Sequence, residues 1–206
     1  MYLNIVDLPG DSLEYETLFE AASAIKGVPG MTCELGVRRG GGSKMIIEGC
    51  FSNDDLNRTH ICVDPYGNID YPRGDEGEII HQDYHNQMRN DCLKNIYAMY
   101  QEHPVNVLFF VMEDTEFFKR FGDGVPIYNE YKQIINQYAL VHFDGPHASH
   151  ILYPEIDFFK TRVSPGAMFV FDDILEYNHD KVEEYLLNDN WQLVKKGQRK
   201  ASYKKL

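Results

Sequence analysis

Short apolar segments that end in acidic residues recur along the chain and alternate with stretches of helical pattern. They lie at residues 31–35, 60–64, 105–112, 139–144 and 167–172. Continuous apolar strands separated by helices are typical of a parallel sheet that is covered on both faces. Two further segments, 191–195 and 201–205, predict an antiparallel hairpin around Gly197 at the end of the chain. The alternation therefore predicts an α/β fold, a three-layer sandwich.

The segments between the strands carry helix signals. Asp11-Ser-Leu-Glu14 has the pattern of a capping box, which predicts a helix that ends before Gly27. Further helices are expected at residues 43–48 (ended by Gly49), 83–102, 128–137, 151–163 and 178–187. Two connections, 66–78 and 122–129, are long for this class of fold, and long loops beside a ligand site often act as lids or specificity elements.

Length and composition limit the partners. We expect one domain over residues 1–206, in which residues 1–30 form an N-terminal helical cap. The formal charge of −12 disfavours nucleic acid and leaves a small molecule as the expected partner. No apolar run is long enough to span a membrane, and the four cysteines show no C-x-x-C pairing. We therefore expect a cytoplasmic protein with reduced thiols and no membrane partner.

Acidic residues stand where each predicted parallel strand ends. They are Glu34, Asp64, Glu113 with Asp114, Asp144, and Asp172 with Asp173. In an open parallel sheet, ligands bind beyond the carboxyl ends of the strands. Caps and loops explain one or two such acids, but a full set favours a functional rim.

The turn after the first strand is rich in glycine. It reads Glu34-Leu-Gly-Val-Arg-Arg-Gly-Gly-Gly-Ser43, which allows close backbone approach to a ligand at the start of a helix. It is not a P-loop, and Arg38 breaks the G-x-G-x-x-G pattern of dinucleotide sites. Asp64 ends the second strand, where a carboxylate can grip a ribose diol.

With these motifs the sequence resembles class I S-adenosylmethionine-dependent methyltransferases. Glu-Leu-Gly-Val-x-x-Gly-Gly, Phe-Asp-Gly-x-His and Pro-Gly-x-x-x-x-x-Asp-Asp, in this order, are similar to the macrocin O-methyltransferase group of methyltransferase family 24. The resemblance covers roughly residues 13–190. It implies a Rossmann-like, seven-stranded, mostly parallel sheet whose C-terminal hairpin is antiparallel.

The resemblance also implies roles for particular residues. The methionine end of S-adenosylmethionine would contact Glu34, Gly36, Gly41 and Ser43, the ribose would contact Asp64, and the adenine would approach Asp114. A divalent ion would be held by Asp144, Asp172 and Asp173. Three carboxylates are hard ligands that suit Mg²⁺ better than zinc.

His147 is the expected general base, with Asp144 as its catalytic companion. Several relatives carry an aspartate two residues after the first metal ligand, where this chain has Pro146. Histidine has a suitable unperturbed pKa for taking a hydroxyl proton near neutrality. A capping histidine near the metal is the alternative.

Together these features predict a Mg²⁺-dependent O-methyltransferase that acts on a vicinal-diol-like small molecule, either a sugar or a phenolic compound. Two alternatives stay open: an NAD-type oxidoreductase on a Rossmann-like sheet, and a catalytically silent methyltransferase-like binding module. Missing G-x-G-x-x-G glycines disfavour the first, and the full set of rim acids disfavours the second. A homo-oligomer is left open.

Overall fold

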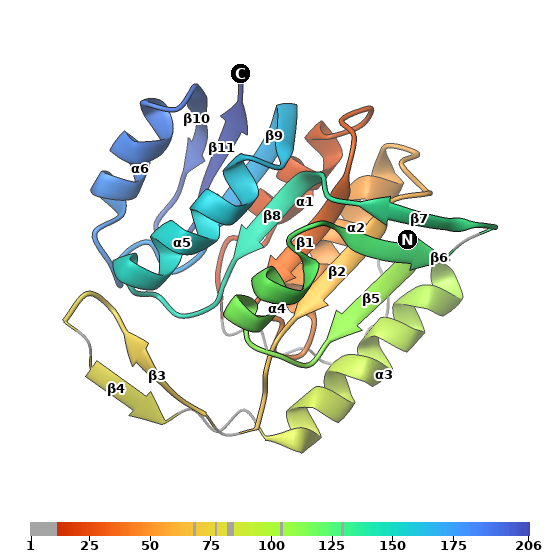
Figure 1. Ribbon diagram of the computed structural model, residues 1–206, viewed down its shortest axis with the longest axis horizontal. Coiled ribbons are helices and arrows are strands. Elements are labelled where there is room, and N and C mark those ends of the chain that lie inside the picture. Colours follow the sequence, from red (N-terminus) through yellow and green to blue (C-terminus); the bar gives the residue numbers. More distant parts are fainter. Residues whose placement is uncertain (1–11, 68, 77, 82–84, 104, 129) are drawn as a thin grey trace.

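A single large sheet forms the middle of the molecule (Figure 1). The computed structural model describes residues 12–67, 69–76, 78–81, 85–103, 105–128 and 130–206. The seven strands follow the order β10-β11-β9-β8-β1-β2-β5. Their bounds are β1 (Met31–Leu35), β2 (Thr59–Val63), β5 (Asn106–Phe110), β8 (Tyr138–Phe143), β9 (Val163–Phe171), β10 (Trp191–Lys196) and β11 (Ala201–Lys205). Only β11 runs antiparallel to its neighbours, which confirms the predicted sheet and its closing hairpin.

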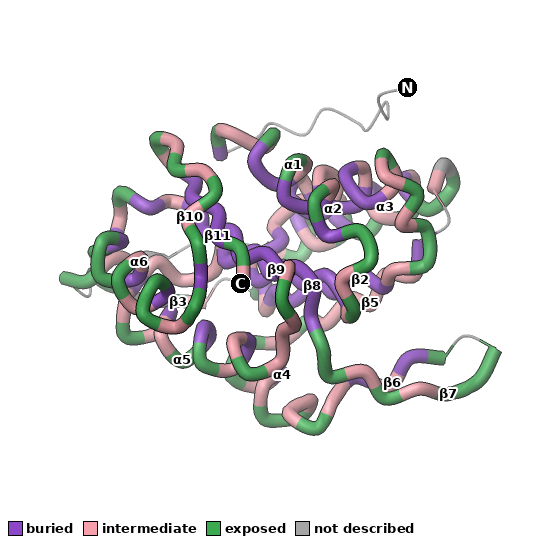
Figure 2. The backbone as a smooth tube through the Cα atoms, turned by 90° about the horizontal axis from the view of Figure 1, so that it is seen from above, coloured by how far each residue is buried: buried purple, intermediate pink, exposed green. Residues whose placement is uncertain are grey.

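Helices cover both faces of this sheet, so the three-layer prediction is confirmed (Figures 1 and 2). One layer holds α1 (Glu16–Ala24), α2 (Gly41–Ser52) and α3 (Asn86–Glu102). The other holds α4 (Asp114–Phe121), α5 (Ser149–Lys160) and α6 (His179–Leu187). Among the helices of the described residues, none is both long enough and apolar enough to cross a membrane.

The central strands are buried along their whole length, as their continuous apolar sequences predict. Every residue of β1, β2 and β8 is buried, and these strands lie in the interior in Figure 2. The largest core cluster includes Phe143, Phe171 and Phe159. A second cluster joins α1 and α2 to the opposite face through Leu18, Ile46 and other residues.

The helix expected at residues 128–137 is wrong. The chain there forms a hairpin of β6 (Val125–Tyr128) and β7 (Lys132–Ile135). Side chains along β6 alternate between the core and the surface, with Val125 and Ile127 buried, and this period of two is that of a strand. The preceding α4 was not expected, although acids in its first turn and Lys119 and Arg120 in its last turn are helix signals.

Two helix boundaries also differ from expectation. Gly49 does not end a helix but lies inside α2. A glycine is needed at this position, because a Cβ there would come within 2.7 Å of Ala22 Cβ and 2.6 Å of the Phe19 carbonyl oxygen. Glycine thus permits α1 and α2 to pack closely. The N-terminal helix begins at Glu16 without a side-chain cap, and Asp11 of the expected capping box lies outside the described residues.

The long connection after β2 contains a second hairpin, of β3 (Asp70–Arg73) and β4 (Glu78–His81). It lies beyond the carboxyl ends of the sheet strands (Figure 1). Asp75, in its turn, accepts hydrogen bonds from the backbone amides of Ser149 (2.7 Å) and Asn178 (2.9 Å). The hairpin is therefore tied to the start of α5 and to the loop before α6.

Candidate active site

The turns after β1 and β8 touch each other at the carboxyl rim of the sheet. Gly36 has φ +79°, a left-handed conformation that favours glycine, and a Cβ at this position would overlap the carbonyl oxygen of Asp144. The strand order places β1 directly beside β8, so the two predicted motifs meet here. The two motifs are far apart in the sequence, so this contact can be predicted only once the strand order is known.

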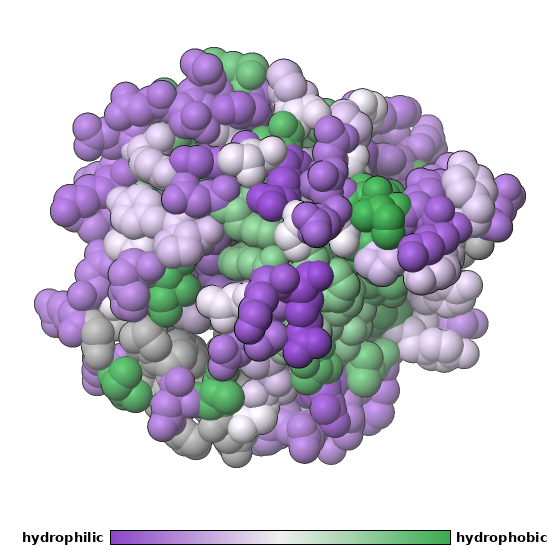
Figure 3. Space-filling view, in the orientation of Figure 1, coloured by the Kyte–Doolittle hydropathy of each residue, from purple (hydrophilic) through white to green (hydrophobic). Residues whose placement is uncertain are grey.

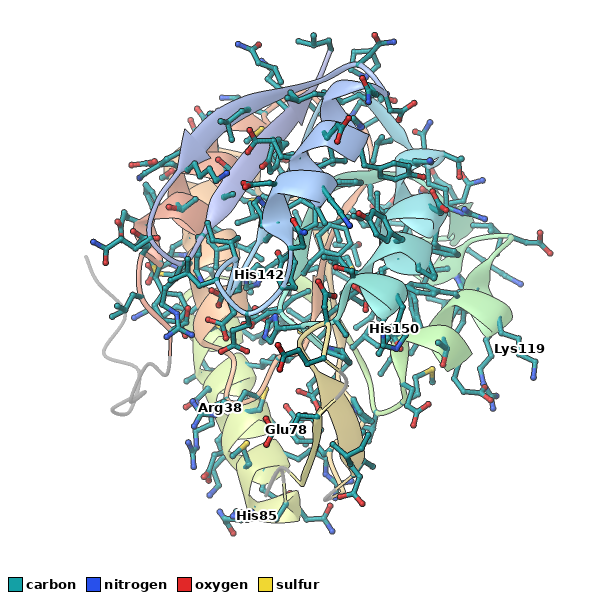
Figure 4. All side chains as sticks on the ribbon, turned by 90° about the vertical axis from the view of Figure 1, so that its left-hand side faces the viewer. Arg38, Glu78, His85, Lys119, His142 and His150 are labelled. Atoms are coloured by element: carbon teal, nitrogen blue, oxygen red, sulfur yellow. The ribbon has the colours of Figure 1, made fainter. Side chains whose placement is uncertain are left out.

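Glu34 is enclosed beneath this turn and is held by two side chains. Its Oε2 accepts a hydrogen bond from the Ser43 hydroxyl at the start of α2, and its Oε1 lies 2.9 Å from His142 Nδ1. Strand register places Glu34 beside His142 on β8, and the side chain of His142 lies well inside the molecule (Figure 4). The structure thus brings the predicted residues Glu34 and Ser43 together and adds His142, which the sequence reading missed.

The hydrogen bonds continue from Ser43 to β2. His60 Nε2 lies 2.9 Å from the Ser43 hydroxyl, and its Nδ1 lies 2.9 Å from the hydroxyl of Thr32. We refer to Thr32, His60, Ser43, Glu34 and His142 as the buried relay. Burial lowers the pKa of His60 to about 4, so its ring is neutral near pH 7. The relay fixes the base of the glycine turn by hydrogen bonds rather than by apolar packing.

Asp64 binds the glycine turn itself. Its Oδ2 accepts hydrogen bonds from the backbone amides of Val37 and Arg38, each 2.9 Å long, and its Oδ1 accepts one from Tyr66 at 2.9 Å. Burial raises the pKa of Asp64, although the three amides favour the charged form and oppose this shift. Asp64 therefore joins the end of β2 to the turn after β1, and its predicted contact with a ribose stays a prediction.

Asp114 is paired with a carboxyl group that the sequence reading missed. It is the first residue of α4, and its Oδ1 accepts a hydrogen bond from the Thr115 amide at 2.7 Å. Its side chain also pairs with Glu155 of α5, which is 1% exposed. Burial first, and then Asp114, raise the pKa of Glu155 well above its ordinary value. Burial and the neighbouring Asp114 carboxyl group thus both favour the neutral form of Glu155.

His147 lies at the rim between two predicted acids. Its Nε2 is 3.9 Å from Asp144 Oδ1 and 3.4 Å from Asp173 Oδ2. Its side chain is 12% exposed, and its ring lies parallel to that of Tyr177. The structure therefore brings together the predicted base His147 and its predicted companion Asp144, and adds Asp173 to the pair.

Asp172 forms a buried ion pair of its own. Its Oδ2 contacts the ammonium of Lys200, a side chain with no exposed surface, and accepts a hydrogen bond from Ser12 at 2.7 Å. Burial alone would raise the pKa of Asp172, but Lys200, His142 and Ser12 outweigh it and lower the pKa. The structure thus places the two neighbouring acids Asp172 and Asp173 in separate surroundings.

The predicted Mg²⁺ ligands do not form one ligand set. Among the described residues, two groups offer three ligand atoms mutually within 4.8 Å: Glu34 with His142 and Asp144, and His147 with Asp173 and Glu176. Asp144, Asp172 and Asp173 do not form such a group, and Arg199 Nε donates to Asp173 at 2.7 Å. The donor set as it stands does not fit the predicted ion, because two of its three carboxylates already bind protein cations.

Comparison with known protein families shows to which family the chain belongs. A family model described as a methyltransferase domain (Methyltransf_24) matches residues 33–174, more than half of the chain. The chain belongs to this methyltransferase family. The class is that of S-adenosylmethionine-dependent methyltransferases, as the motifs of the first turn and the two later strands predict. A search of curated proteins finds no match.

Solved structures share the fold of this methyltransferase. The O-methyltransferase NovP has a TM-score of 0.53 and 18% identity, over 93% of this chain and 78% of that chain. An O-methyltransferase from Bacillus cereus, in complex with SAH, has a TM-score of 0.60 and 9% identity, over 98% and 84%. The calicheamicin methyltransferase CalS11 has a TM-score of 0.57 and 12% identity, over 92% and 76%.

Proposed function

We propose that this methyltransferase transfers the methyl group of S-adenosylmethionine to a hydroxyl oxygen of a small molecule. The observation that carries the proposal is the position of His147 at the rim, with Nε2 3.9 Å from Asp144 and 3.4 Å from Asp173. A base flanked by two carboxylates, beside a glycine turn, suits removal of a hydroxyl proton.

The residues around the glycine turn fit the methionine end of the cofactor. At the start of α2, Gly40, Gly41 and Gly42 add no side chains, and the helix has no side-chain cap. Free helix amides favour a carboxylate. Gly41 faces Tyr15, whose hydroxyl would lie 3.0 Å from a Cβ at Gly41. We assign the ribose to Asp64 and the adenine to the neighbourhood of Asp114.

The bound cofactor supplies a methyl group made electrophilic by a positively charged sulfur. The reaction breaks the carbon–sulfur bond, forms a carbon–oxygen bond, and leaves the hydroxyl proton on His147. The carboxylates of Asp144 and Asp173 stabilise the imidazolium that forms. The rim residues hold the acceptor oxygen in line with the methyl group.

Two structural relatives suggest the acceptor. CalS11 is described as a TDP-rhamnose 3'-O-methyltransferase, and another neighbour as a putative caffeoyl-CoA O-methyltransferase. We propose a sugar or phenolic hydroxyl as the acceptor here. Figure 3 shows hydrophobic side chains at the surface in the centre of a largely hydrophilic face. The four buried free cysteines favour a reducing, cytoplasmic location.

The cofactor is tested by isothermal titration of the protein with S-adenosylmethionine and, separately, with NADH. We expect binding of the first and none of the second. Binding of NADH alone would contradict the proposal and favour the oxidoreductase alternative. Binding of S-adenosylmethionine without methyl transfer to any sugar or phenol in an acceptor panel would favour the silent binding module.

The base is tested by His147→Ala, with the exposed His150→Ala as a matched control. We expect the first variant to lower kcat by roughly 10²–10⁴-fold, the range typical of a lost general base, while cofactor affinity is retained. The control should keep the full rate. A full rate in His147→Ala would show that the histidine is structural.

A further inference from the structure

A lysine with no exposed surface is rare in proteins unless it is paired. Lys200 directly precedes β11, and its ammonium contacts Asp172 and donates to the Ser12 hydroxyl at 2.6 Å. Ser12 in turn donates to the same Asp172 oxygen, and the Lys200 ammonium lies 5.2 Å from the centre of the Tyr15 ring. Lys200 is thus enclosed by Asp172, which follows β9, and by Ser12 and Tyr15, which precede α1.

Arg199 provides a second positive charge one residue earlier. Its Nε donates to Asp173 Oδ1 at 2.7 Å, and its Nη2 contacts the same oxygen. Arg199 Nη2 also lies 4.0 Å from Glu176 Oε1. Glu176 belongs, with His147 and Asp173, to one of the two groups of possible metal ligands described above. Consecutive basic residues therefore neutralise the consecutive acids Asp172 and Asp173.

Three carboxylates at the strand ends repel one another unless positive charge lies between them. Two single charges on Lys200 and Arg199 supply the same total as one divalent cation. A cation bound to Asp172 would have to displace a buried ammonium and leave it without a partner, which is strongly unfavourable. We propose that Lys200 and Arg199 take the charge-balancing place of a metal ion, and that methyl transfer by this chain needs no divalent cation.

This inference rests on the proposed function and narrows the acceptor. A metal ion can chelate two neighbouring oxygens of a diol, whereas the enclosed Lys200 ammonium cannot touch an acceptor at all. Activation then depends on His147 alone, which needs one hydroxyl. The acceptor therefore needs one reactive hydroxyl, and a vicinal second hydroxyl is not required.

The test is titration of the wild-type protein with Mn²⁺, followed by electron paramagnetic resonance, because bound Mn²⁺ loses its free-ion signal. We expect the free signal throughout a titration to millimolar Mn²⁺, and unchanged S-adenosylmethionine affinity in EDTA. One Mn²⁺ bound per chain, and lost in Asp172→Asn, would overturn the inference. Failure of S-adenosylmethionine to bind at all would contradict the proposed function instead, and the Mn²⁺ result is read independently of it.

Two variants sharpen the result. Lys200→Met removes the ion pair of Asp172, and Arg199→Gln removes that of Asp173. The Arg199 side chain is partly exposed, so its substitution should disturb the fold less. We expect the double variant to bind Mn²⁺ at least about tenfold more tightly than wild type, because removing the cations leaves the carboxylates unneutralised. If Lys200→Met does not fold, Arg199→Gln alone carries the comparison. Affinity equal to wild type in a folded variant would show that the two cations do not hold the place of a metal.

Discussion

The buried relay joins polar groups in the centre of the sheet by hydrogen bonds, from Thr32 through His60 and Ser43 to Glu34 and His142 Nδ1, while His142 Nε2 has no hydrogen-bond partner among the described residues. With its proton on Nε2, the His60 ring accepts a hydrogen bond at Nδ1 from the Thr32 hydroxyl and donates one to the Ser43 hydroxyl. Ser43 then donates to Glu34. A neutral ring is required for this pattern, because a second proton on the ring removes its acceptor. The stability of the molecule is thus linked to the protonation of one histidine.

Acid should destabilise the protein through His60. The pKa of this ring is lowered to about 4 in the folded state, from an ordinary value of 6.5, so the unfolded chain binds more protons between these values. Stability should fall as the pH drops from 6.5 to 4, by as much as roughly 3 kcal/mol. Urea unfolding at pH 7 and pH 5 should show a smaller fall for His60→Gln than for wild type. The exposed His150→Gln should match wild type.

Glu155 should act in the opposite direction. Its pKa is raised in the folded state, chiefly by burial, so its contribution to stability is complete below its ordinary pKa and declines as the pH rises. Gln keeps the shape and the hydrogen-bond donor but carries no charge. We expect Glu155→Gln to be more stable than wild type at pH 8, by on the order of 1 kcal/mol. Equal pH profiles of the two proteins in thermal unfolding would show that the charge on Glu155 does not affect stability.

At this scale the sequence predicted residue types but not their partners. The acids at the strand ends and His147 could be named because a strand end is a position in the sequence. The buried roles of Lys200 and Glu155 could not be predicted, because a basic residue in a hairpin and an acidic residue in a helix are usually exposed. The one signal for Glu155 was its place on an apolar helix face, next to Ile156 and three residues from Leu152.

The β3–β4 hairpin connects elements that are far apart in the sequence. Asp75 binds amides at the start of α5 and before α6, and a Cβ on Gly74 would lie 2.8 Å from the Glu176 carbonyl oxygen. The loops after β8 and β9 carry His147 and Asp173. The hairpin tip therefore holds together the two loops that form the proposed catalytic group.

Removal of the Asp75 carboxylate should loosen both loops. Asp75→Ala leaves the amides of Ser149 and Asn178 without their acceptor, so we expect their hydrogen exchange to become about tenfold faster. Glu76→Ala, an exposed neighbour in the same turn, is the control. Unchanged exchange at both amides would show that the hairpin is held by other contacts.

Elements were predicted well where periodicity was long and unbroken. The buried parallel strands matched to within a few residues, because a continuous apolar run has few other interpretations in an alternating chain. The prediction for residues 128–137 was wrong because the strands of the β6–β7 hairpin are only four residues long, so the alternation of buried and exposed side chains repeats only twice in each. Helix α2 was cut short because Gly49 reads as a stop signal, whereas its role is a close approach to α1.

Across the whole molecule, the two ends of the described chain form one unit. The Glu14 carboxylate accepts hydrogen bonds from the amides of Gln198 (2.8 Å), Arg199 (3.0 Å) and Lys200 (3.0 Å), in the turn between β10 and β11. These bonds, first of all that from Gln198, lower the pKa of Glu14. The turn is thus shaped by a carboxylate from the opposite end of the chain, and it carries both cations of the rim.

Loss of the Glu14 charge should weaken this unit. Glu14→Gln can accept fewer of the three amide hydrogen bonds, and we expect the free energy of unfolding to fall by about 1–2 kcal/mol in urea. The exposed Glu16→Gln is the control. Because the pKa of Glu14 is lowered on folding, the difference between wild type and Glu14→Gln should shrink as the pH falls through that pKa. A difference that persists at low pH would show that the charge is not responsible.

The pairing of Lys200 with Ser12 and Asp172 has a consequence for synthesis on the ribosome. Ser12 and Lys200 are separated by 188 positions, and Ser12 and Asp172 by 160. The glycine turn, the relay and the rim acids are all translated before Lys200 leaves the exit tunnel. A nascent chain at that stage holds Asp172 without its ammonium, and burying it then carries an electrostatic penalty. Lys200, directly before β11, therefore emerges after the other parts of the reaction centre and supplies the ammonium that lets this centre close, so that the centre completes its folding only once β11 has been made.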